Sequence, residues 1–186
     1  MGGVCEGGVV DAQTRRDRFE EIAPALIEPL RRFLARRTDP ATADDVLSET
    51  LLVCWRRLEE LPAEPLPWAY GVARNCLANA ERGVRRQERV AAKVAVLDRP
   101  AESTAGPGQG DDLLSDAMAA LRPDDAELLR LWAWEQLTPA EIAAVLDITP
   151  NAASIRLHRA REKLRAELRK TGQPAGHEGS RERREP

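Results

Sequence analysis

The fold is decided by residues 138–170, a stretch that begins TPAEIAAVLDITPN and continues AASIRLHRAREKLRAELRK. Thr138, Pro139 and Glu141 have the spacing of a helix start, with a capping threonine, a proline at the first helical position and a glutamate that completes a capping box. Apolar residues then recur every three or four positions, which indicates a short amphipathic helix. Pro150 disfavours helical backbone at the residue before it, so we expect a break there.

A second helix is predicted from Ala152 to Lys170, and it is strongly basic. It carries seven basic residues against two glutamates, and its apolar side is expected to consist of Ile155, Leu157, Ala160, Leu164 and Leu168. Two short helices joined by a tight turn, the second one basic, are typical of a helix-turn-helix, whose second helix lies in the major groove of DNA. The alternative is a solvated helix hairpin. Asp147 stands where such turns often have glycine, and aspartate tolerates a positive φ better than most residues.

Length and composition predict an all-α fold of two small helical domains joined by a flexible linker. The 186 residues allow one domain or two, strand signals are scarce, and glycine and proline cluster outside the periodic segments. We expect a disordered N-terminus (1–14), a first domain (15–95), a flexible linker (96–112), a helix-turn-helix domain (113–170) and a disordered tail (171–186).

Several function classes are disfavoured by what the sequence lacks. No apolar run reaches the roughly 18 residues that span a bilayer, and the first ten residues lack the pattern of a signal peptide, so we expect a cytoplasmic protein that meets no membrane. Cys5, Cys54 and Cys76 are far apart, and His158 and His177 complete no ligand set. We therefore expect no metal, no cofactor and, without a recognisable catalytic set, no enzyme.

Charge alternates along the first domain although the net charge is only −3. Residues 38–66 contain seven acids against two arginines, whereas residues 68–93 contain six bases against two glutamates. Such a chain is suited to bind a basic protein through its acidic block and nucleic acid through its basic block.

The first domain is predicted to contain three helical segments. A helical period runs from Phe19 to Arg37, where Pro24 and Pro29 predict a kink or two shorter helices. Residues 42–45 then have the pattern of a second capping box. The helix that follows is expected to bury Leu47, Leu51, Trp55 and Leu58 and to expose Asp44, Asp45, Ser48 and Glu49. Solubility and the helix dipole alone would explain these acids.

A third helix is predicted from Trp68 to Arg82, followed by a basic exit segment at residues 83–87. Its core stripe is expected to contain Trp68, Val72 and Cys76, widened by Ala73, Leu77 and Ala80. Another face carries Arg74, Asn75, Asn79 and Arg82. Asparagine and arginine on one face, with aromatics nearby, suit contact with unpaired nucleic-acid strands. A solvated helix face fits this pattern equally well.

Two ordered blocks of sequence resemble a known family. Residues 44–51, 55–58 and 68–75 are similar to region 2 of sigma-70-type RNA polymerase sigma factors, and residues 120–164 are similar to their region 4. The short connection between them, with no room for a region 3, resembles the extracytoplasmic-function subgroup.

The resemblance implies a protein that binds core RNA polymerase, recognises the −35 and −10 promoter elements and opens DNA. Members are usually held by an anti-sigma factor, so such a partner is expected here too. The alternative is a helix-turn-helix regulator that binds duplex DNA without joining polymerase.

Site residues follow from the resemblance, position by position. Contacts to core polymerase are expected from Asp44, Asp45, Ser48 and Glu49, with Ser48 in place of the usual glutamine. Contacts to the melted −10 strand are expected from Trp68, Arg74, Asn75, Asn79, Arg82, Arg85 and Arg86, on the helix and the loop after it. Contacts to the −35 element are expected from Asn151, Ala152, Ser154, Ile155, Arg156, His158, Arg159 and Arg161.

The first residues of the predicted basic helix (152–170) differ from the pattern of the family. The usual threonine-valine-lysine-serine reads Ala152-Ala153-Ser154-Ile155 here, which leaves the −35 sequence preference open. Arg156, near the helix start, is expected to reach a base edge, whereas Lys163 and Arg165 are expected to attract phosphates.

Overall fold

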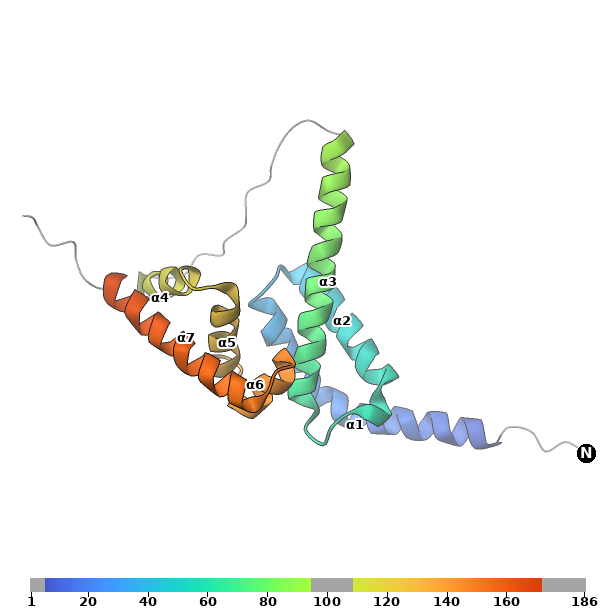
Figure 1. Cartoon of the computed structure of the whole chain (residues 1–186). Helices are drawn as coiled ribbons and strands as arrows, with labels where there is room; N and C mark the ends of the chain where they lie inside the picture. Colours follow the sequence, from blue (N-terminus) through green and yellow to red (C-terminus); the bar gives the residue numbers. More distant parts are fainter. Residues whose placement is uncertain (1–5, 95–108, 172–186) are drawn as a thin grey trace, which may run out of the picture.

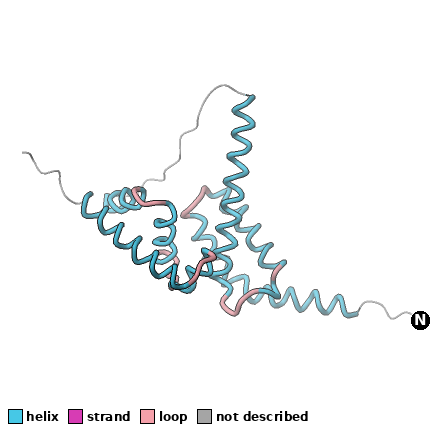
Figure 2. The backbone as a smooth tube through the Cα atoms, in the orientation of Figure 1, coloured by secondary structure: helices cyan, strands magenta, loops and turns pink. Residues whose placement is uncertain are grey.

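The computed structural model describes residues 6–94 and 109–171, and within these ranges it contains seven α-helices, one 3₁₀ turn and no strand (Figures 1 and 2). This confirms the predicted all-α fold. The elements are α1 (Glu6–Ala35), α2 (Pro40–Arg56), η1 (Leu58–Glu60), α3 (Pro65–Val94), α4 (Gln109–Ala119), α5 (Pro123–Ala133), α6 (Pro139–Leu146) and α7 (Pro150–Thr171). Residues 1–5, most of the predicted linker and the predicted tail from residue 172 lie outside the described residues.

Helix α1 is a single element that includes Pro24 and Pro29. Of the two expectations, a kink or two shorter helices, the single helix excludes the second. It also begins at Glu6, within the stretch that we expected to be disordered through residue 14. Adding residues to an existing helix is easier than starting one, so a long folded helix can extend through a glycine-containing end.

Helix α2 begins earlier than predicted. Asp39 is its N-cap, accepting hydrogen bonds from the backbone N–H groups of Ala41 and Thr42 at 3.1 Å each, and Pro40 occupies the first turn. The predicted capping box at residues 42–45 was therefore wrong, because an aspartate followed by proline makes a better helix start. Hydrogen bonds from Thr42 stabilise the carboxylate and lower the pKa of Asp39 below its usual value.

The buried face of α2 is rotated from the predicted one. Leu47 is buried as expected, but Leu51 and Trp55 are only half-buried. The other buried residues of α2 are Ala43, Val46, Thr50 and Cys54. Thr50 is tolerated inside because its hydroxyl donates to the carbonyl oxygen of Val46 at 2.7 Å. This rotation leaves Asp44, Asp45, Ser48 and Glu49 exposed, as predicted.

Helix α3 continues straight through the position where the sequence suggested an exit segment. Residues 83–87 are helical and exposed, and the C-terminal part of the helix projects away from the other helices (Figure 1). The expected loop after Arg82 is thus a helix, since Gly83 alone does not end it. The buried face consists of Ala69, Tyr70, Ala73, Cys76 and Leu77, whereas Trp68 and Val72 are half-buried.

The two halves of the chain share one apolar core. Residues of α1–α3 and of α5–α7 belong to a single buried cluster, and α3 packs directly against α6. Gly71 makes this close approach possible, because a Cβ there would lie 3.3 Å from the carbonyl oxygen of Val145. A larger side chain at this position would push the helices apart.

A buried ion cluster joins the same two halves next to this contact. Arg37, after the end of α1, lies 3.2 Å from both Glu127 in α5 and Glu135 after α5. Arg36 lies 3.3 Å from Glu135. The side chains of Arg37 and Glu135 are only 8% and 3% exposed, so these charges depend on each other for compensation.

Candidate nucleic-acid interface

The helix-turn-helix is assembled by the local signals that the sequence predicted. The backbone N–H of Thr138 donates to a Glu141 carboxylate oxygen at 2.7 Å, and the backbone N–H of Glu141 donates to Thr138 Oγ1 at 3.3 Å, so the capping box is confirmed. Hydrogen bonds from Thr138 lower the pKa of Glu141. The start of α6 is thereby fixed, and with it the direction in which the chain enters the turn.

The turn between α6 and α7 is made by Asp147 in a left-handed conformation. Its φ of 52° and ψ of 51° confirm the expected use of aspartate at a positive φ. The next residue, Ile148, donates its N–H to the carbonyl oxygen of Ala143 at 3.0 Å, and the Thr149 hydroxyl accepts from the N–H of Ala152 at 3.2 Å. These contacts close α6 and cap α7, which begins at Pro150.

Helix α7 divides into a buried face and an outward face. Ala153, Leu157 and Ala160 are buried, and Leu164 is half-buried. Ile155, which we expected on this apolar side, is instead 45% exposed, and Leu168 is 36% exposed. The predicted −35 residues that the structure leaves exposed on α7 are Asn151, Ser154, Ile155, Arg156, His158 and Arg159.

Two basic side chains of α7 are already engaged within the protein. Arg161 is half-buried, and its guanidinium lies 4.5 Å from the centre of the Trp132 ring. Lys163 forms an ion pair with Asp125 of α5. Both contacts hold α7 against α5, so these residues contribute to positioning the helix as well as to its charge. Neither pairing was predictable from local sequence patterns, because the partners lie about 30 residues or more away along the chain.

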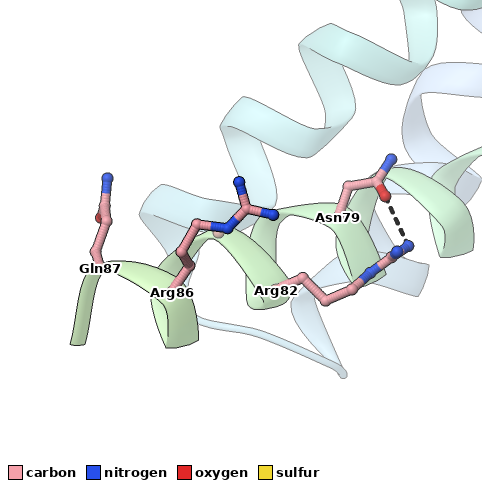
Figure 3. A pocket seen from close by; sticks show the side chains of 5 residues that line it. Asn79, Arg82, Arg86 and Gln87 are labelled. Atoms are coloured by element: carbon pink, nitrogen blue, oxygen red, sulfur yellow. Dashed lines mark hydrogen bonds between the residues drawn. The ribbon is translucent and has the colours of Figure 1, made fainter. Parts of the chain in front are cut away.

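On α3, polar side chains form a single row. Asn75, Asn79, Arg82 and Arg86 are separated by four, three and four residues, which places them on one face of the helix. Arg82 donates to the Asn79 side-chain oxygen at 2.7 Å (Figure 3). Around them a hollow is lined by Asn79, Arg82, Gly83, Arg86 and Gln87, all exposed. Gly83 leaves this hollow open because it has no side chain.

The other residues predicted for the −10 strand lie away from the exposed part of this row. Trp68 falls on the same row two turns earlier but is half-buried and packs against the apolar core. Arg74 is half-buried, and Arg85 pairs with Glu81 at 3.7 Å; both lie to the side of the row. The structure therefore brings together Asn75, Asn79, Arg82 and Arg86, and separates Trp68, Arg74 and Arg85 from them.

The acidic surface of α2 occupies two neighbouring rows. Asp44 and Ser48 are four residues apart, as are Asp45 and Glu49, so the four side chains cover adjacent strips of the exposed face. The Ser48 hydroxyl donates to the carbonyl oxygen of Asp44 at 2.9 Å. Ser48 thus satisfies its donor within its own helix, and the three carboxylates carry the charge of this surface.

The described residues offer no alternative site of metal or thiol chemistry. Within residues 6–94 and 109–171, no group of three or more histidine, cysteine or acidic side chains is placed to hold a metal ion. Burial raises the pKa of Cys54 to about 11 and also raises that of Cys76, so both thiols behave as core side chains. None of the described helices is long and apolar enough to cross a bilayer.

Comparison with known proteins supplies relatives for most of the chain. Residues 111–164 match the family described as Sigma-70, region 4. The RNA polymerase sigma factor CarQ of Myxococcus xanthus is 32% identical over 157 residues, which cover 81% of this chain and 88% of the relative. The ECF RNA polymerase sigma factor SigL of Mycobacterium tuberculosis is 29% identical over 181 residues, covering 92% of this chain and 98% of the relative.

A solved structure with a similar fold covers both halves. The sigma factor RpoE from Bartonella quintana, determined in complex with the anti-sigma factor NepR, superposes with a TM-score of 0.58 at 21% identity. The match covers 81% of this chain and 96% of that chain. The shared architecture thus includes helices on both sides of the α3–α6 contact.

Proposed function

This chain belongs to the sigma-70 family of RNA polymerase sigma factors, in the extracytoplasmic-function subgroup, and we propose that α2 binds core polymerase, α3 holds the −10 element and α7 reads the −35 element. The observation that carries the proposal is the two-sided character of α7. Its apolar face is buried against α5 and α6, and its outward face presents polar and basic side chains. A helix held in this way is suited to enter the major groove.

For the −10 element, the proposal rests on the row of Asn75, Asn79, Arg82 and Arg86. Amide groups can pair with the edge of a base that has left the stack, while guanidinium groups attract the backbone phosphates. In the free protein Arg82 is bonded to Asn79. Binding a base with Asn79 therefore requires exchange of this contact, which is exposed and easily broken.

For core polymerase, the proposal rests on Asp44, Asp45 and Glu49. These carboxylates are exposed on α2. They do not contribute to the core, and their common charge suits contact with a basic partner surface. We also propose that an anti-sigma factor binds this chain, as one binds the similar sigma factor from Bartonella quintana.

The decisive experiment is run-off transcription with purified core polymerase and a library of genomic promoters. A sigma factor should yield discrete transcripts that share two sequence elements. A free-standing helix-turn-helix regulator should yield none and should bind duplex DNA tightly without core. The relatives favour the first outcome, because they are sigma factors and their similarity extends over most of this chain.

The docking surface is tested by charge reversal with a matched control. Asp45→Lys with Glu49→Lys should weaken capture of core polymerase without unfolding the protein, because exposed charges contribute little to stability. Glu20→Lys with Glu21→Lys makes the same change of charge at two exposed positions of α1. Equal capture by the two double variants would refute the assignment to α2.

A further inference from the structure

Ile155 stands at the centre of the outward face of α7. It is two residues from both Ala153 and Leu157, which are buried, and a rotation of two residues is about 200° in an α-helix. The Ile155 side chain therefore projects from the side of α7 opposite its buried face. It is 45% exposed although it is large and apolar.

The neighbours of Ile155 on this face form a row of three. Asn151 and Arg159 lie four residues before and after it, and all three are exposed. Arg156 is about 100° around the helix from Ile155, which puts it on the flank of the row. The expectation that Arg156 reaches a base edge stays a prediction, and the row lies more centrally on the outward face. A flank position near the groove wall suits contact with phosphate, and the row suits contact with bases.

Ser154 does not compete for the centre of this face. It lies about 100° from Ile155 on the other side, and its hydroxyl donates to the carbonyl oxygen of Pro150 at 3.0 Å. The row of Asn151, Ile155 and Arg159 consequently presents an amide, a branched hydrocarbon and a guanidinium, in that order along the helix.

We propose that Ile155 packs against the 5-methyl group of a thymine in the −35 element and so determines the preference for thymine at one promoter position. The inference rests on the proposed function of α7. Thymine is the base that offers an apolar group in the major groove, and an apolar side chain is the group that distinguishes this methyl from hydrogen. An exposed isoleucine alone would be unremarkable; its place at the centre of the row, between an amide and a guanidinium, decides its role.

Replacement of thymine by uracil tests the contact directly, because it removes only the methyl group. Promoters selected by the holoenzyme are synthesised with each −35 thymine, on either strand, changed singly to uracil. Closed-complex affinity is then measured for wild-type, Ile155→Val and Ile155→Ser holoenzymes. One substitution should weaken wild-type binding about three- to fivefold, the effect of burying one methyl group.

The variants identify the residue responsible for this effect. Ile155→Ser should bind the thymine and uracil promoters equally, and Ile155→Val should keep part of the difference. Leu168→Ala, which removes another exposed apolar side chain of α7, should behave as wild type. Wild-type binding that is insensitive to every uracil, or a difference that persists in Ile155→Ser, would overturn the inference.

Failure of the proposed function would give a different binding result from failure of the Ile155 contact. A promoter with a scrambled −35 element serves as the reference in the same assay. If the wild-type holoenzyme binds it as well as the selected promoter, α7 does not read the −35 element at all. If scrambling weakens binding but no single uracil does, α7 reads DNA without the methyl contact of Ile155.

Discussion

Arg37 should be among the most sensitive charged positions for stability. Arg37→Met keeps the aliphatic part of the side chain but leaves the carboxylates of Glu127 and Glu135 without this partner. Their side chains are 17% and 3% exposed. Removing one member of a buried ion pair destabilises proteins by about 3–5 kcal/mol. Since Arg36 still lies 3.3 Å from Glu135, we expect the lower end, about 3 kcal/mol.

The matched control is Arg32→Met in the last turns of α1, just before Arg37 in the chain. Arg32 lies 4.0 Å from Glu28, with side chains 62% and 64% exposed, and such surface pairs contribute at most about 1 kcal/mol. Equilibrium urea unfolding measures both variants. For a chain of this size, about 3 kcal/mol also corresponds to a fall in Tm of about 6–12 °C.

A double variant separates the loss of charge pairing from the loss of packing. Arg37→Met with Glu135→Gln removes one of the charges left unpaired, so it should regain part of the stability lost by Arg37→Met alone. Equal unfolding free energies for Arg37→Met and Arg32→Met would refute the reasoning, and so would a double variant less stable than Arg37→Met.

Three further predictions concern α3 and α6. Gly83→Ala should stabilise the protein by about 0.5–1 kcal/mol, because alanine favours helix and a Cβ there meets nothing within 4 Å; Gly71→Ala should show no such gain in urea unfolding, since its Cβ would press on Val145. Because the pKa of Glu141 is lowered, the capping box stabilises the fold fully above the ordinary pKa of glutamate and loses this contribution as the pH falls through the lowered pKa. Glu141→Gln should therefore flatten the acid side of a plot of unfolding free energy against pH, and an unchanged plot would contradict the assignment. Asn75→Ala and Asn79→Ala should preserve closed complexes but reduce permanganate reactivity of −10 thymines on duplex promoters, with partial recovery on a pre-melted bubble; wild-type reactivity in both variants would mean that this row is merely solvated.

Some features set by neighbours in sequence were predictable, although the capping box expected at residues 42–45 did not form. The capping box of Thr138 and Glu141 and the left-handed Asp147 each depend on a few adjacent residues, and the structure shows them as expected. Asp44, Asp45 and Glu49 were predicted to be exposed and are exposed, since ionised carboxylates are rarely buried without a partner.

Features set by contacts between distant parts of the chain were not predictable from the sequence. The buried face of α2 turned toward Val46 and Thr50, and that of α3 toward Ala69 and Tyr70, because α1 and α6 pack on sides that periodicity alone could not assign. Ile155 was assigned to the core because it is apolar, but its spacing does not fit the apolar side of α7: nine residues separate it from Leu164, which is about half a turn around the helix. The packing of α5 and α6 against the opposite side of α7 leaves the Ile155 side chain 45% exposed.

The projecting end of α3 has a consequence for its local stability. Residues 81–87 are all exposed, and this part of the helix extends beyond the rest of the protein (Figure 1). Isolated helices shorter than about 12–15 residues are marginally stable in water. The outer turns of α3 should therefore open far more often than the turns around Ala73, with amide hydrogen exchange rising toward Val94. A DNA strand that binds Arg82 and Arg86 must then also order this part of the helix, so some binding free energy is used in folding, and exchange at these amides should slow when DNA is bound.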